Sequence, residues 1–260
     1  MKKYLVIGNP IKHSLSPKLH NYWIKENNID AVYDMKQINE SDIEGIIKEI
    51  KNDKINGVNV TVPFKKSVVP FLDQLSPLAN EVQSVNTIFK KNNKIIGDNT
   101  DIGGFEQDIK NINYNIKNKK IFILGAGGVA PAIILALKRL EVGKITISNR
   151  TKKQADDLKK KFSDIEIIDW GQNTDFDMII NATSLGLKNE DQIKLDFSKM
   201  GSNKLFYDVI YNPSKTNFLL KGEKFGNKIK NGKMMFIYQA QLAFKIWHNI
   251  LPKIKDNLLD

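Results

Sequence analysis

Short apolar runs alternate with amphipathic stretches along almost the whole chain. Runs of about four to eight apolar residues between turn signals are typical of strands, whereas apolar residues three and four apart indicate helices. In the first hundred residues this pattern predicts strands at 4–7, 32–36 and 58–62, a hairpin of 86–89 with 94–97 that turns at Asn92–Asn93, and helices from residue 17 and over 43–50. These elements predict a mixed α/β domain.

A second series of strands begins at residue 120 and keeps the order of strand, then helix or loop. Strands are predicted at 120–124, 144–148, 165–168, 177–181 and 205–209. Strands that alternate with helices form parallel sheets, so this half predicts a Rossmann-like, doubly wound sheet. A long apolar helix over 234–250 is expected to return to the first domain. We therefore expect two domains, residues 1–103 with 234–260, and residues 104–233.

Glycines stand at the first turn of the second series, directly between a strand and a helix. Gly125-Ala126-Gly127-Gly128-Val129-Ala130 follows the apolar run 120–124 and precedes the helical stretch 132–138. Such a turn lets the backbone approach a pyrophosphate and directs helix N-terminal N–H groups at it. Glycine turns of this kind also occur in α/β proteins that bind nothing there. The pattern favours a dinucleotide without proving one.

The residues after the next strand indicate which dinucleotide fits. An NAD site presents Asp or Glu to the ribose 2′-hydroxyl at about this distance from the glycines. Asn149-Arg150-Thr151 stands here instead, without an adjacent carboxylate. A guanidinium suits the 2′-phosphate of NADP, and the alternative is a surface arginine at a strand end. We predict NADP as the cofactor.

Composition limits the classes of function. The 260 residues contain no cysteine, which excludes disulfides and thiolate chemistry, and His13, His20 and His248 lack the spacing of metal ligands, so no metal is predicted. The net charge of +11 comes from lysines that are spread along the chain and mixed with acidic residues. We interpret them as solvated surface that helps attract anionic ligands, not as a nucleic-acid interface. Without a membrane-span or signal-peptide pattern, we expect a cytoplasmic protein.

Polar side chains gather at strand ends in the first domain. Asn59 and Thr61 alternate with valines, so both leave one face of a strand, and Pro63 is expected to end that strand before Lys65 begins a helix. Asn86-Thr87 and Asn99-Thr100-Asp101 stand at two further strand ends. Each has a local explanation, since Asn and Asp favour turns and Asp101 is suited to cap a helix over 103–109. Together they favour one shared ligand site.

Two serines follow the first strand. Ser16 at a helix N-cap with Pro17 at the first helical position is an ordinary helix start, which leaves Ser14 unexplained. Two hydroxyls beside a helix N-terminus would also hold a carboxylate. Both interpretations stay open on these residues alone.

Ordered motifs along nearly the whole chain resemble the shikimate dehydrogenase family. They are Gly8-Asn-Pro10, Ser14-x-Ser16-Pro17, Asn59-Val-Thr-Val-Pro-Phe-Lys65, Asn86-Thr87, Asn99-Thr-Asp101-x-x-Gly104, the Gly125 loop, Asn149-Arg-Thr151, Asn181-Ala-Thr-Ser-x-Gly186, Asp208-x-x-Tyr211-x-Pro213 and Gln239-Ala240. The resemblance implies an oxidoreductase that reversibly reduces 3-dehydroshikimate to shikimate with NADPH, in aromatic amino acid (chorismate) biosynthesis.

The resemblance also implies roles for individual residues. Lys65 and Asp101 match the catalytic acid–base pair. Positions that bind the substrate match Ser14, Ser16, Asn59, Thr61, Lys65, Asn86, Asp101, Tyr211 and Gln239. Positions that bind the cofactor match Gly125, Ala126, Gly127, Gly128, Val129, Ala130, Asn149, Arg150, Thr151, Lys153, Thr183 and Met235. The chain departs from the family pattern at Pro131, Gln154 and Met234, where Arg, a basic residue and Gly are frequent.

Two other functions remain as alternatives. A relative that accepts quinate or uses NAD would share the architecture, and a nucleotide-sensing protein would bind both ligands without turnover. Retention of Lys65 and Asp101 favours the enzyme, because a sensor needs neither. Tyr211 is equally explained as a packing residue. The partner is expected to be a small-molecule substrate, in a monomer or a homodimer.

Overall fold

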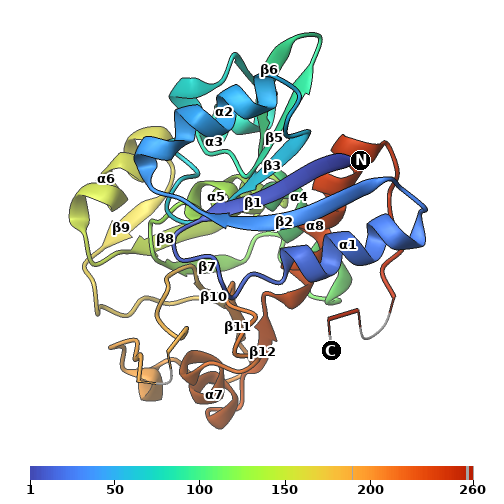
Figure 1. Ribbon diagram of the computed structural model, residues 1–260. Coiled ribbons are helices and arrows are strands. Elements are labelled where there is room, and N and C mark those ends of the chain that lie inside the picture. The colour runs from blue at the N-terminus through green and yellow to red at the C-terminus, as the bar shows by residue number, and fades with distance from the viewer. Residues whose placement is uncertain (189, 256–257, 260) are drawn as a thin grey trace. The chain divides into compact units, whose positions relative to one another are not determined.

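The chain folds as alternating strands and helices, which confirms the predicted α/β class (Figure 1). The computed structural model describes residues 1–188, 190–255 and 258–259, and these divide into two compact units. Unit 1 comprises Met1–Gly104 together with the chain from Ile237 onward, and unit 2 is Phe105–Phe236. Both divisions fall inside helices, α4 (Thr100–Asn111) and α8 (Lys233–His248).

Unit 1 is built on a mixed sheet. Over its described residues, six strands lie in the order β2 (Ala31–Gln37), β1 (Lys2–Gly8), β3 (Gly57–Val60), β5 (Thr87–Lys91), β6 (Lys94–Asp98) and β4 (Gln74–Leu75). β1 is parallel to β2 and β3, whereas β5 is antiparallel to both β3 and β6. The predicted hairpin is confirmed. Its turn residues Asn92 and Asn93 have φ of 51° and 59°, a conformation that asparagine tolerates.

The two faces of this sheet are covered by different helices. On one face α2 (Ile43–Lys51) packs its buried isoleucines against Leu5, Ile7, Val58 and Val60. Alternate strand residues point to opposite faces, so Tyr4 faces the other side, where its ring contacts those of Trp247 and His248 in α8. α1 (Ser16–Glu26) lies alongside β2 (Figure 1). The short elements of this unit are η1 (Glu40–Asp42), η2 (Val69–Phe71) and α3 (Pro77–Val82).

The predictions for the stretch after the third strand are wrong in two respects. β3 ends at Val60, so Thr61 follows the strand instead of belonging to it. Residues 62–68 form consecutive turns, and no helix begins at Lys65. Pro63 has no backbone N–H to donate, and the N–H of Phe64 instead turns back to the carbonyl of Thr61. Lys65 therefore sits on a tight turn.

Two predicted helix caps are also wrong. α1 begins at Ser16, and it is the hydroxyl of Ser14 that accepts from the Ser16 N–H, at 3.3 Å. α4 begins at Thr100, so Asp101 lies within its first turn, and Asn99 Oδ1 accepts from the Asp101 N–H at 3.1 Å. The orphan N–H groups of a helix start take the nearest acceptor on the preceding loop. In both places that acceptor lies two residues before the N–H it caps.

Unit 2 is a parallel sheet. Within the part of it that the structure describes, six strands lie in the order β12 (Lys228–Asn231), β11 (Leu205–Asp208), β10 (Met178–Asn181), β7 (Lys120–Leu124), β8 (Lys144–Ser148) and β9 (Glu166–Ile168). These strands all pair in parallel, which confirms the predicted doubly wound sheet. β12 is absent from the prediction because Ile229 is its one apolar residue; an edge strand is free to be polar.

Helices cover this second sheet. They are α5 (Ala130–Arg139), α6 (Lys152–Lys161), α7 (Asn217–Lys224) and the short η3 (Phe197–Lys199). α5 is buried from Ala130 to Leu137, whereas α6 buries Ala155 and Leu158 only. α7 packs beside β11 and β12 (Figure 1). Over the described residues, no helix has the length and apolar content needed to cross a membrane.

A buried histidine lies among aromatic rings in unit 1. His20 of α1 is 1% exposed and stacks on Tyr33, with ring centroids 4.2 Å apart. Among the described residues, neither ring nitrogen of His20 has a hydrogen-bond partner. Burial, and secondarily the nearby His248, lowers the pKa of His20 to about 3. The ring is therefore neutral at pH 7.

We expect acid to destabilise the protein through His20. Its pKa in the fold lies below the ordinary value of 6.5, so the stability it contributes is present above that pH and is lost as the pH falls toward 3. His20→Phe keeps a stacked ring and cannot take up a proton. At about pH 5 the variant should retain roughly 2 kcal/mol that the wild type has lost. Thermal melts across this pH range measure the difference.

The exposed His13 supplies the control, since His13→Phe changes a histidine that packs against no core. Its melting temperature should follow that of the wild type at every pH. If His20→Phe lost stability in acid as steeply as the wild type, the neutral buried imidazole would not be the sensitive group.

Candidate active site

A lysine and an aspartate form a buried ion pair in unit 1. Lys65 Nζ lies 2.6 Å from Asp101 Oδ2, and the two side chains are 11% and 7% exposed. The turn after β3 carries Lys65, and its carbonyl accepts a hydrogen bond from the N–H of Val85. The first turn of α4 carries Asp101. A buried ammonium and carboxylate in contact are suited to hold a proton and deliver it to a ligand.

Asn86, just before β5, connects this pair to its surroundings. Its Nδ2 donates to Asp101 Oδ1 at 2.9 Å and to Thr100 Oγ1 at 3.0 Å, and lies 3.3 Å from Gln239 Oε1. Its Oδ1 accepts from the N–H of Thr100 at 2.8 Å. One side chain therefore caps α4 and orients the Asp101 carboxylate, while Asp101 Oδ2 is left to Lys65.

Asn59, on β3, has a fully determined orientation. Its Nδ2 donates to the Asn86 carbonyl and to Thr87 Oγ1, both at 3.1 Å. Its Oδ1 accepts from Tyr33 Oη at 2.7 Å. An amide nitrogen has two hydrogens, and both are used here. A ligand group that bonds to Asn59 in this arrangement has to donate to its oxygen.

The serines and Thr61 lie at the carboxyl ends of β1 and β3. Ser16 is 7% exposed, and its side chain acts to lower the pKa of Tyr33 against the larger, opposite effect of burial. The N–H of Thr61 donates to the carbonyl of Ile7 at 2.9 Å. A Cβ at Gly8 would stand 2.5 Å from Thr61 Cγ2, so only glycine lets these two segments approach so closely.

The structure thus joins most of the predicted unit 1 residues by hydrogen bonds. The linked residues are Asn59, Lys65, Asn86, Asp101 and Gln239, whereas Ser14 bonds to the N–H of Ser16. Tyr211 belongs to unit 2, where its ring stacks on Phe236 at 4.5 Å. Sequence analysis missed Tyr33, which donates to Asn59. The strand order β2–β1–β3 would have revealed it, but no local pattern encodes that order.

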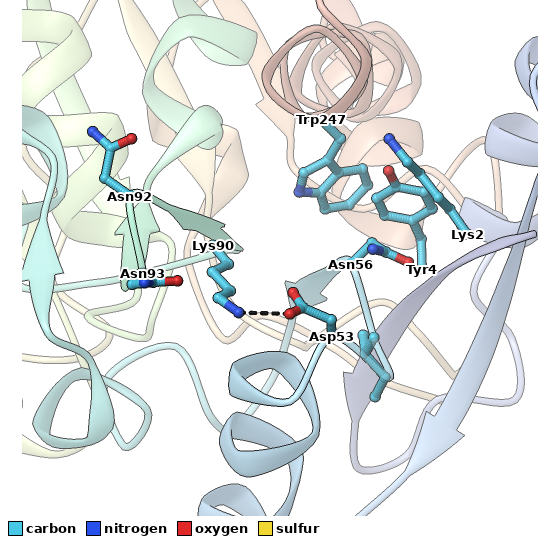
Figure 2. Close-up of a pocket in the computed structure, with 9 residues that line it drawn as sticks. Lys2, Tyr4, Asp53, Asn56, Lys90, Asn92, Asn93 and Trp247 are labelled. Carbon is cyan, nitrogen blue, oxygen red and sulfur yellow. Dashed lines mark hydrogen bonds and ion pairs between the residues drawn. The ribbon is translucent and has the colours of Figure 1, made fainter.

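Unit 1 also contains a pocket of about 520 Å³ that none of the predicted site residues lines. Figure 2 shows Lys2, Tyr4 and Trp247 on one side of it and Asn92 on the other. An ion pair between Lys90 and Asp53, 2.7 Å long, lies within it. The pocket and the cluster around Lys65 therefore have no lining residue in common, and a concave surface alone would not have identified the candidate site.

The glycine loop of unit 2 has the conformation that close backbone approach requires. Gly125 follows β7 with φ of +105°, and a Cβ there would lie 2.9 Å from the backbone of Ala182. Gly127 borders open space, since a Cβ would meet nothing within 4 Å. The N–H of Ala126 is held by Asn149 Oδ1 at 3.0 Å. The loop thus leads directly into the N-terminus of α5.

The residues after β8 form an exposed basic turn. Asn149 Nδ2 donates to the Thr151 carbonyl at 2.8 Å and to Gln154 Oε1 at 3.1 Å, which fixes the turn. The Arg150 side chain is exposed and forms no ion pair with the residues that the structure describes. Lys153, also exposed, lies in the first turn of α6. Two cations without an adjacent carboxylate suit a phosphate.

A buried network shapes the loop that carries Thr183. Asn181 Oδ1 accepts from the N–H and the hydroxyl of Thr183, at 3.1 and 2.7 Å, and its Nδ2 donates to Asp208 Oδ1 at 3.0 Å. Burial raises the pKa of Asp208 to about 6, although Thr216 donates to it at 2.6 Å. Asn181 and Asp208 are therefore supports of the loop. Thr183 is the half-buried residue that the loop presents.

Met235 lies in the first turn of α8, within unit 2. The fully buried Asp108 of α4 accepts from Tyr207 Oη at 2.8 Å and lies 3.1 Å from Lys230 Nζ. Burial raises the pKa of Asp108, and the Lys230 charge opposes that rise. Asp108 thereby fixes α4 to β11 and β12.

The residues of unit 2 fit a phosphorylated dinucleotide. Gly125 follows β7, Thr183 follows β10 and Arg150 follows β8, so all three lie at the carboxyl edge of neighbouring strands. The strand order reverses beside β7, and ligands of doubly wound sheets bind at such a point. Open space at Gly127 admits a pyrophosphate, and Arg150 stands where NAD sites have an acid. In the described part of the chain, no group of three or more His, Asp or Glu is placed to hold a metal ion.

Comparisons with known proteins find one family along both halves of the chain. A model of the shikimate dehydrogenase substrate binding domain matches residues 6–88, and a model of shikimate / quinate 5-dehydrogenase matches residues 107–190. Shikimate dehydrogenase (NADP(+)) of Pelagibacter ubique is 59% identical over 262 residues, which covers 100% of this chain and 99% of that protein.

Solved structures match over the same length. A shikimate dehydrogenase in complex with NADP+ has a TM-score of 0.92 at 32% identity and covers 97% of this chain and 92% of its own. Shikimate 5-dehydrogenase from Thermus thermophilus, in complex with NADP(H) and shikimate, has a TM-score of 0.89 at 29% identity and covers 97% of this chain and 95% of its own.

Proposed function

The chain belongs to the shikimate dehydrogenase family, and on that premise we propose that it catalyses the reversible, NADP-dependent reduction of 3-dehydroshikimate to shikimate. The observation that carries the proposal is the buried Lys65–Asp101 pair within a cluster of neutral amides and hydroxyls. A small ring with one carboxylate and several hydroxyls requires this mixture of groups. A sensor would need the amides but gains nothing from a buried proton donor, whereas the assay below separates shikimate from quinate.

The neutral side chains are proposed to bind the ring. Ser14 and Ser16 hold the carboxylate, and Asn59 accepts a hydrogen bond from a ring hydroxyl. Asn59 can only accept a hydrogen bond from the substrate, because both of its N–H groups donate to other atoms of the protein. A substrate without that hydroxyl would leave a buried acceptor unpaired, which costs binding free energy. Thr61, Asn86, Gln239 and Tyr211 complete the proposed set.

Lys65 is proposed as the proton donor during reduction. Negative charge grows on the C3 oxygen as the carbonyl is reduced, and the Lys65 ammonium stabilises that charge and then donates a proton to the oxygen. Asp101 keeps the ammonium in place through Oδ2, and Asn86 fixes the carboxylate through Oδ1. In the oxidation direction, a neutral Lys65 accepts the hydroxyl proton.

The glycine loop and the basic turn are proposed to hold NADP. Gly125 to Ala130 line the pyrophosphate, and Asn149, Arg150, Thr151 and Lys153 hold the adenosine ribose and its 2′-phosphate. Thr183 and Met235 flank the nicotinamide half. The reduced nicotinamide, when bound, supplies the hydride that the C3 carbon receives. Asn181 holds the loop that carries Thr183 in position through two hydrogen bonds.

An absorbance assay tests the proposed function. Purified protein is mixed with shikimate or quinate, each with NADP+ or NAD+, and formation of reduced nicotinamide is followed. We expect a rapid rise with shikimate and NADP+ and little with the other three pairs. A larger rate with quinate or with NAD+ would identify the protein as a quinate-accepting or NAD-using enzyme instead. NADP+ binding without turnover in any mixture would favour a sensor and refute the enzyme.

A further inference from the structure

Tyr33 stands on the same face of the unit 1 sheet as Asn59. It lies on β2, opposite Tyr4 of β1, and Asn59 of β3 lies opposite Val6 of the same β1. Tyr4 and Val6 are two residues apart, so they point to one face, and their partners on either side do the same. The phenol ring of Tyr33 therefore reaches across β1 toward Asn59.

The hydroxyl of Tyr33 binds one of the proposed substrate-binding residues, since it donates to Asn59 Oδ1 at 2.7 Å. Burial raises the pKa of Tyr33 well above its usual value, so the hydroxyl keeps its proton and stays a donor. Both N–H groups of Asn59 are already engaged by the Asn86 carbonyl and Thr87 Oγ1. Together with Tyr33, these bonds fix the direction of the Asn59 amide.

Tyr33 is held both at its backbone and at its ring. Asn21 of α1 binds the Tyr33 backbone twice, donating to its carbonyl at 2.7 Å and accepting from its N–H at 2.9 Å. The imidazole of His20 stacks on the ring with an interplanar angle of 4°. Tyr33 is 2% exposed. A phenol so constrained places its oxygen with little freedom, as a support for ligand-binding groups should.

We propose that Tyr33 is a positioning residue of the substrate site, whose hydroxyl orients the Asn59 oxygen that accepts from a ring hydroxyl. The inference rests on the proposed function for the identity of the ligand. Tyr33 itself does not bind the ring. It holds the Asn59 amide from the oxygen side, while Asn86 and Thr87 hold it from the nitrogen side.

Tyr33→Phe removes only the hydroxyl and keeps the stacked ring. KM for shikimate should rise about tenfold, because Asn59 loses the donor that orients its oxygen. KM for NADP+ should stay as in the wild type, since unit 2 supplies the proposed cofactor residues, and kcat should change by less than about threefold. Steady-state kinetics with each substrate varied in turn separates these parameters.

Tyr4→Phe is the matched control. Tyr4 is also 2% exposed and lies opposite Tyr33, but its hydroxyl has no hydrogen-bond partner among the described residues and its side chain lines the pocket in Figure 2. This variant should keep both KM values. Thermal melts of the two variants separate a loss of stability from a loss of positioning, because a merely structural role for Tyr33 would lower the melting temperature without the selective rise in KM.

A double-mutant cycle of Tyr33→Phe with Asn59→Ala adds a second test. If Tyr33 acts through Asn59, the double variant should show a smaller rise in KM for shikimate than the product of the two single rises. Two results would overturn this inference but leave the proposed function intact. One is that the two single rises in KM multiply in the double variant, and the other is that KM is unchanged in Tyr33→Phe while the wild type is active. A wild type that does not turn over shikimate would overturn the proposed function, and the inference with it.

Discussion

Lys65→Ala should lower kcat by about 10³-fold or more in both directions while shikimate still binds. General acid–base groups contribute about 10²–10⁴-fold, and Lys65 also stabilises the charge that grows on the C3 oxygen. Neither action is needed to hold the ring, because the serines and amides remain. Turnover is measured by nicotinamide absorbance, and shikimate binding by titration calorimetry.

Two further variants make this result interpretable. Lys65→Ala leaves the buried Asp101 carboxylate without its ammonium partner, which destabilises a fold, so Lys65→Met, which keeps the apolar stem, checks that the loss is chemical. Lys66→Ala changes the adjacent, exposed lysine and should keep nearly full turnover. Equal and mild losses in Lys65→Ala and Lys66→Ala would refute the assignment of Lys65 as proton donor.

Arg150→Asp should reverse the preference for NADP over NAD. Arg150 is exposed and forms no ion pair within the residues described, so its guanidinium is available to a 2′-phosphate. A carboxylate at that position repels the phosphate and accepts from the 2′-hydroxyl of NAD. We expect KM for NADP+ to rise by roughly 10²-fold and KM for NAD+ to fall, which together invert the ratio of kcat/KM values.

The chain's other arginine gives the control for this prediction. Arg139 ends α5 and pairs with Glu106, so Arg139→Gln removes a guanidinium of unit 2 without touching the basic turn. Its cofactor preference should equal that of the wild type. If Arg150→Asp left the preference unchanged, the phosphate contact would have to come from Lys153 or another cation.

The elements that sequence reasoning predicted well are those whose signals are local. The hairpin follows from two asparagines between alternating strands, and the glycine loop follows from a strand, a turn and a helix in immediate succession. The buried strands of unit 2 are recognisable in the sequence as apolar runs. The edge strand β12 is not recognisable in this way, because most of its residues are polar. The hydrophobic pattern of a sequence therefore predicts buried strands more reliably than exposed ones.

The errors at the helix starts have a common cause. Ser14 and Asn99 were available as caps beside Ser16 and Asp101, and serine, asparagine and aspartate have about equal preferences for the N-cap position. Intrinsic preference therefore does not decide between neighbouring residues of these types. Which residue caps each helix depends on where the preceding strand, β1 or β6, stops pairing. The loop that follows the strand then brings one particular side chain to the helix N–H groups.

The amino-acid sequence alone indicates the α/β class, the glycine loop, the basic turn at Arg150 and, through ordered motifs, the residues Lys65 and Asp101 at the candidate active site. The fold was needed to show that Asn86 orients Asp101, that Asn59 can offer a ligand its oxygen but not its nitrogen, and that Tyr33 donates to Asn59. Residue type and spacing depend on neighbours along the chain, whereas hydrogen-bond partners depend on which strands lie side by side, and that order follows from how the whole chain buries its apolar surface.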